Sequence, residues 1–397
     1  MPTGRAALVL TIALAALLCA CPSTSKKPDS SNAGSNGTAS PDTDTEPDDG
    51  TEAVVVYEND DLRIYAPDTG SFFEDLEIFL GGERSPSIAL RKIVATHDLS
   101  SWTYRPEVPD AVEITRDAVE ELRDSDYDSW EETSLIVQVV SMMAVRDPAS
   151  VVRTDCLSTL DWFRTRVREE VIRLDPPLET TEQDVTSAFE ALDAAKGDRR
   201  AAADPKKAKI LLHAVGVLGS HRWDEVDSDR PAHWRSSLSG PRHVVRRLGR
   251  RDVTAHRANP EIAGAVDAAL IRVTDQIIIM TMIGALADRT AYVRAAAAKT
   301  LAEARDPRAV SPIILSIDTE PRDFVIQDLV RALGRCALGE KRREAVPALA
   351  GLLVHTDVTV RQAAAREMER LTGAGLDVDP AAWLRWWKDN AKDYGQR

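Results

Sequence analysis

The feature that most constrains this chain is a pattern that returns every 33 to 36 residues in its last third. Val293-Arg294 recurs as Val360-Arg361, 67 residues later, and Val325-Ile326 stands about halfway between them. A companion pattern, AVSPIILSI from Ala309, returns as AVPALAGLL from Ala345. A period near 34 residues made of paired amphipathic helices is typical of an α-solenoid, in which each hairpin buries its apolar face against the next.

The repeat also carries signals for where its helices start and stop. The segment from Val293 to Ala304 is rich in alanine, the best helix former, and its small side chains allow a neighbouring helix to come close. Asp306-Pro307 ends this helix and opens the next, because proline is well tolerated in a first helical turn. The sequence therefore predicts a tight helical hairpin.

The stretch VRAAAAKTLAEARDPRAVSPII resembles a HEAT repeat of the short type that is also found in phycobilin lyases. The resemblance covers Asp275 to Thr372, and an earlier copy, DPASVVRTDCLSTL, starts at Asp147. Two further stretches, 204–219 and 259–273, look like degenerate copies. The resemblance implies an armadillo-like helical stack.

The resemblance also implies that an acid before the second helix pairs with the Val-Arg arginine of another repeat. Asp147 and Asp288 stand six residues before Arg153 and Arg294, as this pattern requires. The third such arginine is Arg361, but His355 holds the acid's place before it, and Ile326 replaces the arginine of the intervening repeat. We therefore expect a broken ladder of exposed ion pairs that contributes little stability.

The amino terminus has the pattern of a targeting segment over residues 1–21, with Arg5 before the apolar run Ala6–Leu18. It ends in Leu18-Cys19-Ala20-Cys21, which resembles the lipobox of bacterial lipoproteins and implies lipidation of Cys21. The alternatives are an ordinary secretory signal or lipidation of Cys19, although Leu17 fits poorly before Cys19. Residues 22–52 are almost free of apolar side chains, which predicts a disordered tether.

The rest of the chain predicts an all-α fold, an α/α superhelix of the HEAT-like solenoid type. We expect an N-terminal cap over 53–82 with a β-hairpin in Ala53–Ala66, helical repeats over 83–375, and a tryptophan-rich capping helix over 376–397. Early helices are predicted at 85–96, 109–123, 129–145, 148–172 and 181–196. The segment 219–238 has little pattern and predicts an insertion; whether 219–259 binds a partner is left open.

Two groups of side chains are candidate binding residues. Trp383, Trp386 and Trp387 share one helical face, which indicates either a cover for the end of the core or a platform for sugars. The basic run Arg242, Arg246, Arg247, Arg250 and Arg251 lies opposite Val244, Val245 and Leu248. We interpret this run as a solvated helix face, with contact to anionic lipid or an acidic partner as the alternative.

No nucleotide, hydrolase or zinc-helix motif stands in the sequence, so we expect no catalytic, cofactor or metal site. Cys156 and Cys336 are predicted to be small core residues. The net charge of −14 argues against nucleic-acid binding. We expect a monomeric, non-enzymatic scaffold that is lipid-anchored in the bacterial envelope and binds protein partners on the concave face of the solenoid. The alternatives are an envelope glycan-binding protein using the C-terminal tryptophans and a lyase-like enzyme related to the short HEAT-repeat lyases.

Overall fold

The structure is a computed structural model, and it describes residues 55–58, 63–65, 85–98, 101–196, 198, 200–223, 239–249 and 256–392. The expectations for the targeting segment, Cys21, the tether, Arg250 and Arg251 lie outside these residues. Fourteen α-helices and two short pairs of strands are described, so the fold is all-α, as predicted.

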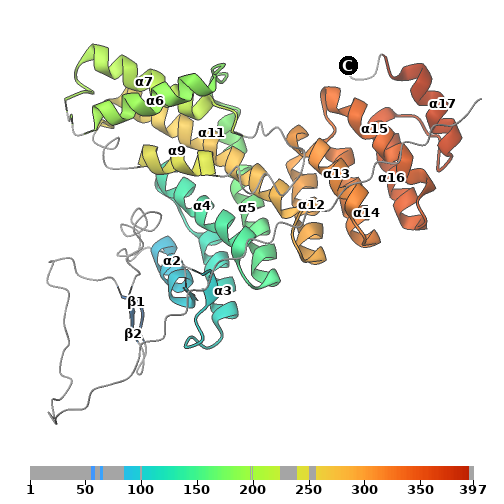
Figure 1. The fold of residues 1–397 in the computed structure, drawn as a ribbon, viewed down its shortest axis with the longest axis horizontal. Helices are drawn as coiled ribbons and strands as arrows, with labels where there is room; N and C mark the ends of the chain where they lie inside the picture. The colour runs from blue at the N-terminus through green and yellow to red at the C-terminus, as the bar shows by residue number, and fades with distance from the viewer. Residues whose placement is uncertain are drawn as a thin grey trace, which may run out of the picture. The chain divides into compact units, whose positions relative to one another are not determined.

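The helices follow one another along the chain with short connections over most of its length (Figure 1). They are α2 (Ser85–Thr96), α3 (Ala111–Asp124), α4 (Trp130–Arg146), α5 (Ser150–Val171), α6 (Glu182–Ala195), α7 (Pro205–Ser220), α9 (Ser239–Gly249), α11 (Pro260–Ala285), α12 (Ala291–Ala304), α13 (Val310–Thr319), α14 (Asp323–Cys336), α15 (Arg342–Gly351), α16 (Val358–Thr372) and α17 (Pro380–Asn390).

The strands form two small antiparallel pairs. β1 (Val55–Glu58) pairs with β2 (Arg63–Tyr65), which confirms the predicted hairpin. β3 (His97–Asp98) pairs with β4 (Thr103–Tyr104) between α2 and α3. The second pair was not predicted, because its strands are only two residues long and carry no alternating pattern.

The predicted early helices are confirmed to within a few residues, because their ends carry local signals. The Ser129 hydroxyl accepts a hydrogen bond from the Glu132 amide, 3.2 Å away, and so caps α4. The Glu132 carboxylate accepts from the Asp128 amide instead of the Ser129 amide, so the reciprocal half of a capping box is not made. Thr181 and Asp184 do form a complete box at the start of α6.

The helices that carry the repeated pattern pack against one another in succession. α5 packs on α12, α12 on α14 and α14 on α16, so the second helices of successive hairpins are neighbours. Their companions follow the same order, since α13 packs on α15 and α15 on α17 (Figure 1). The core that these contacts enclose is built from the repeated valines and alanines, including Val293, Ala297, Val325 and Val360.

Helices α6, α7 and α9 depart from this succession. α6 packs on α7, while α7 and α9 pack on α11. α5 packs directly on α12, although residues 172–290 separate them in sequence. We call the segment that holds α6, α7 and α9 the excursion. The stretch 204–219, which the sequence suggested as a degenerate repeat, forms α7 in this excursion. The stretch 259–273 becomes the first part of the 26-residue helix α11. The insertion is therefore longer than the predicted segment 219–238.

Helix α11 is the one helix within the described ranges whose length and apolar composition would suit a membrane span. In the structure 83% of its apolar window is buried, because α4, α5, α7, α9 and α12 all pack around it. Its apolar surface is thus used in packing within the protein.

Candidate functional site

The Val-Arg arginines repeat not only in sequence but in their hydrogen bonds. Arg153 Nη1 donates to the carbonyl of Asp147, 2.7 Å away, and Arg294 Nη1 donates to the carbonyl of Asp288, 2.9 Å away. Arg361 Nη1 donates in the same way to the carbonyl of His355, 2.7 Å away. Each arginine therefore closes the loop that begins six residues before it.

Two of these arginines also join one repeat to the next. Arg153 forms a two-pronged ion pair with Asp288, with N–O distances of 3.1 and 3.0 Å. Arg294 binds Glu320 in the same manner, at 2.7 Å for both bonds. The Arg153 and Asp288 side chains are only 2% and 3% exposed. The expectation of exposed pairs was therefore wrong for this rung, because close packing of α5 on α12 removes it from solvent.

Glu320 was not predicted as a member of this ladder. Glu320 stands six residues before Ile326, which is the acid's place in its repeat, so the spacing contained the signal. The ladder therefore continues through two rungs before Ile326 and His355 break it, as predicted for those two positions.

At the N-terminal end of the ladder, Asp147 is bound by His97 and Tyr104, which the sequence did not suggest. His97 Nε2 lies 3.1 Å from Asp147 Oδ2, and the Tyr104 hydroxyl donates to Asp147 Oδ1 at 2.7 Å. Burial and the Asp147 carboxylate raise the pKa of Tyr104 well above its ordinary value, so the phenol stays protonated as a donor. His97 is completely buried, so these bonds hold the loop that begins at Asp147 against β3 and β4.

Side chains next to the ladder are exposed at repeated positions. The residue before the repeated valine is Val151 in α5, Tyr292 in α12 and Phe324 in α14, with 40%, 75% and 41% of each residue exposed. In α16 the residue before the repeated Val360 is Thr359, and Val358, one residue earlier, is 50% exposed. We call Val151, Tyr292, Phe324 and Val358 the apolar ridge.

The two aromatic members of the apolar ridge contact each other, and hydrogen bonds join the helices that carry the other members. The rings of Tyr292 and Phe324 lie 5.6 Å apart between centroids, at 35°. Arg153 Nη2 donates to the Thr290 hydroxyl at 3.0 Å, which holds the first turns of α5 and α12 together. Gln327 Nε2 donates to the Thr359 hydroxyl at 2.6 Å and does the same for α14 and α16. Contiguous exposed apolar side chains are typical of sites that bind other proteins.

The three tail tryptophans do not share one environment. Trp383 is completely buried, and its Nε1 donates to the carbonyl of Asp377 at 2.8 Å. Trp386 and Trp387 are partly buried against the core and stack on each other, with centroids 6.4 Å apart. A sugar platform of all three rings is thus not available, and Trp383 acts as part of the core.

The basic run does not form the fully solvated face that the sequence suggested, because α9 packs on both α4 and α11. Arg242 and Arg246 are partly buried, and Arg247 forms an ion pair with Asp193. Burial and the nearby charge of Arg146 lower the pKa of Arg242 to about 10. Val244, Val245 and Leu248 are buried, as predicted.

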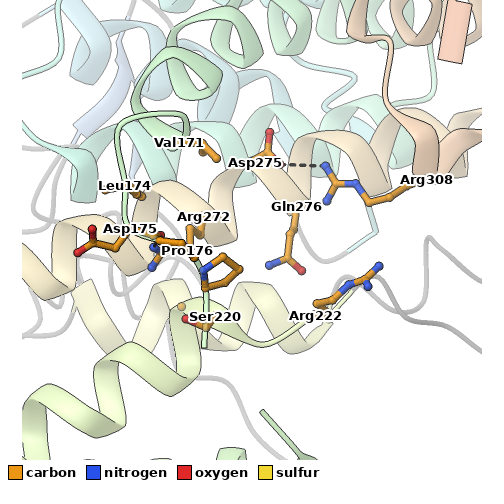
Figure 2. Close-up of a pocket in the computed structure, with 12 residues that line it drawn as sticks. Val171, Leu174, Asp175, Pro176, Ser220, Arg222, Arg272, Asp275, Gln276 and Arg308 are labelled. Carbon is orange, nitrogen blue, oxygen red and sulfur yellow. Dashed lines mark hydrogen bonds and ion pairs between the residues drawn. The ribbon is translucent and has the colours of Figure 1, made fainter. Parts of the chain in front are cut away.

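A cavity of about 370 Å³ lies where the excursion leaves and rejoins the succession of helices (Figure 2). Arg308 is paired there with Asp275 at 2.9 Å, and Arg272 donates to the main-chain carbonyl of Asp175. Gln276 accepts from the Trp223 amide at 2.8 Å and donates to the His221 carbonyl at 3.0 Å. The bonds of Gln276 tie the chain after α7 to α11 at the edge of this cavity.

The two described cysteines lie in the core. Cys156 and Cys336 are completely buried, as predicted, and burial raises the pKa of both thiols, that of Cys336 to about 12. Across the described ranges, no three histidine, cysteine or acidic side chains gather in a way that could hold a metal ion.

Comparison with protein-family models and with curated proteins finds no match to this chain. The assignment of a class therefore depends on the internal repeats and on the surfaces described above.

Proposed function

We propose that this chain is a HEAT-like solenoid that acts as a non-enzymatic scaffold and binds a partner protein along its second helices. The observation that carries the proposal is the apolar ridge, in which the residue before the repeated valine is exposed in three successive helices. A stack of helical hairpins offers such repeated positions as one extended surface. The buried ladder beneath them supports this proposal, because it would keep the ridge residues in a fixed order.

The buried ion pairs suit a scaffold better than a catalyst. Removing two charges from water costs about as much as their attraction returns, so such a pair adds little net stability. Its two-pronged geometry does fix the orientation of the groups that it joins. A rigid surface loses little conformational entropy on binding, which favours affinity.

The experiment is site-specific photo-crosslinking in the native host. A benzoylphenylalanine placed at Tyr292 is expected to give a discrete crosslinked protein. The matched control is the same residue at Ile210, which is 56% exposed on α7, outside the ridge. Equal products at both positions, or no product at Tyr292, would contradict the proposal.

The proposal places the scaffold in the cell envelope through the lipid on Cys21, which rests on the lipobox resemblance alone. Metabolic labelling with a palmitate analogue tests it. We expect Cys21→Ser to abolish labelling and membrane fractionation, whereas Cys19→Ser, the neighbouring cysteine, leaves both unchanged. If Cys19→Ser abolishes the labelling and Cys21→Ser does not, the lipidated residue is Cys19 and the assignment to Cys21 is wrong.

A further inference from the structure

A second cavity, of about 330 Å³, lies between the α4–α5 loop and the α11–α12 loop, which lead into the helices that carry Val151 and Tyr292. Its polar lining consists of three arginines and two aspartates: Arg146, Arg153, Arg289, Asp147 and Asp288. We call this cavity the basic notch. The charge that it offers to a ligand depends on which of these five groups already form ion pairs or hydrogen bonds within the protein.

Both carboxylates of the basic notch are already bound. Asp288 receives the two N–H groups of Arg153 and the Thr290 amide, which lies 2.8 Å away. Asp147 is held by His97, by the Tyr104 hydroxyl and by the Ala149 amide at 2.8 Å. Both carboxylates of the notch are therefore already bound by groups of the protein itself.

The two remaining arginines are exposed. Arg289 Nη2 reaches only the carbonyl of Pro148, at 3.4 Å, and no carboxylate of the described ranges forms an ion pair with Arg146 or Arg289. Arg242 adds a third positive charge close to Arg146, and its buried Nε has no hydrogen-bond acceptor within those ranges. Positive charge thus gathers here in a protein whose net charge is −14.

Charges of both signs stand beside the later members of the ridge, including Asp357 directly before Val358. Arg289 stands three residues before Tyr292, and the exposed Arg322 stands two residues before Phe324. Asp323 is the opposing charge at that point, and its carboxylate lies 4.0 Å from His355 Nε2. Within the described ranges, the two guanidinium groups of the notch that have no carboxylate partner therefore lie at the end of the ridge that carries Tyr292.

We propose that the partner presents an acidic–apolar peptide segment, whose aspartate or glutamate enters the basic notch between Arg146 and Arg289 while a flanking aromatic or aliphatic residue packs on Tyr292 and Phe324. A carboxylate matches the fork of an arginine and forms short, charge-assisted bonds with it. The flanking apolar residue of the peptide buries apolar surface against Tyr292 and Phe324, which a carboxylate alone would not do. This inference rests on the proposed scaffold function and names the chemistry of its partner.

The test uses the full chain, purified in mild detergent, and an array of synthetic twelve-residue peptides. One class carries Asp-Phe or Glu-Leu pairs; the others replace the acid with asparagine, the acid with lysine, or the apolar residue with serine. We expect only the acidic–apolar class to bind, and to bind about tenfold more weakly as salt rises from about 50 to 500 mM, since exposed charges are screened.

The variant Arg146→Glu/Arg289→Glu is expected to lose at least about tenfold in affinity for the acidic peptides and to gain affinity for the lysine class. The matched control is Arg385→Glu/Lys388→Glu on α17, which makes the same change of net charge at two exposed positions away from the notch. Equal loss in both variants would show a general charge effect and overturn the inference. Equal binding of the aspartate and asparagine classes would overturn it as well.

The crosslinking result separates this inference from the proposed function. If Tyr292 captures a partner but no acidic–apolar peptide binds, the chemistry assigned to the partner is wrong and the scaffold function stands. If Tyr292 captures nothing, the scaffold function fails, and the inference fails with it.

Discussion

At the scale of single residues, Arg153 and Arg294 each make two kinds of bond with different energetic consequences, whereas Arg361 makes the first kind. The bond from Nη1 to a carbonyl closes a loop within one repeat, whereas the two-pronged bond of Arg153 to Asp288 joins two repeats that are 135 residues apart in sequence. The first is an ordinary hydrogen bond, and the second is a buried ion pair that cannot lose one partner without leaving a buried charge.

Arg153→Met is therefore expected to lower the free energy of unfolding by about 3–5 kcal/mol, because it leaves the Asp288 carboxylate buried without its cation. Arg361→Met is the control, since Arg361 Nη1 donates to the carbonyls of His355 and Thr356; we expect a cost of about 1 kcal/mol. Chemical denaturation measures both. The double variant Arg153→Met/Asp288→Leu should recover much of the loss, and equal costs for the two single variants would rule out a special role for the pair.

The buried thiols give a pH dependence whose sign follows from their raised pKa values. An unfolded cysteine ionises near pH 9.0, whereas in the folded protein burial raises the pKa of Cys336 to about 12. The folded state is thus favoured below pH 9 and loses this contribution as pH rises from 9 towards 12. Cys156, whose pKa is also raised by burial, acts in the same direction.

We expect the unfolding midpoint to fall more steeply with pH above 9 in the wild type than in Cys156→Ala/Cys336→Ala. Burial also raises the pKa of Tyr104 and Tyr127, so the variant keeps part of the slope. Measurements of the midpoint at pH 8, 9, 10 and 11 test this expectation. Parallel curves for the two proteins would show that the thiols do not contribute.

At the scale of elements, the ladder stops at α14 because of two substitutions. Ile326 is buried where an arginine would stand, and His355 holds the place of the acid that would receive it. The Arg361 bond to the His355 main chain does not depend on the side chain at 355, so an acid there keeps the loop closed.

Ile326→Arg alone is expected to destabilise the protein, because it buries a cation without a carboxylate. Adding His355→Asp should return stability through a new rung of the Arg153–Asp288 type. A double-mutant cycle by chemical denaturation is expected to give a coupling of about 1–3 kcal/mol. Independent, additive effects would show that α14 and α16 do not repeat the geometry of α5 and α12.

The helix limits and the repeated core could be predicted because they depend on local signals, such as Ser129 and Thr181 at helix starts and Pro307 after Asp306. The excursion could not, because it depends on how distant helices pack. A side chain on Gly219 would come within 2.5 Å of Ala269, so this glycine allows α7 to pack closely on α11, and no local periodicity reveals that contact. The apolar ridge was missed for a related reason: exposure of Tyr292 and Phe324 is decided by the neighbouring helices.

At the scale of the whole molecule, the succession α5, α12, α14, α16 predicts how damage at one end spreads. In a stack whose units contact only their neighbours, loss of stability stays near its origin. The tail provides the test, because Trp383 is completely buried while α17, which carries it, packs on α15. Helices α4 and α5 lie far along the chain from this end and pack on each other, so they serve as an internal reference.

Trp383→Ala is expected to cost about 3–5 kcal/mol locally, since it removes a fully buried indole and leaves a cavity. Hydrogen–deuterium exchange should then rise in α15, α16 and α17 and remain unchanged in α4 and α5. Leu384→Ala is the control, because Leu384 is 62% exposed on the same helix and its removal should change neither region. A uniform rise in exchange across α4 to α17 after Trp383→Ala would mean that the helices unfold as one cooperative body, and the picture of a linear stack would then be wrong.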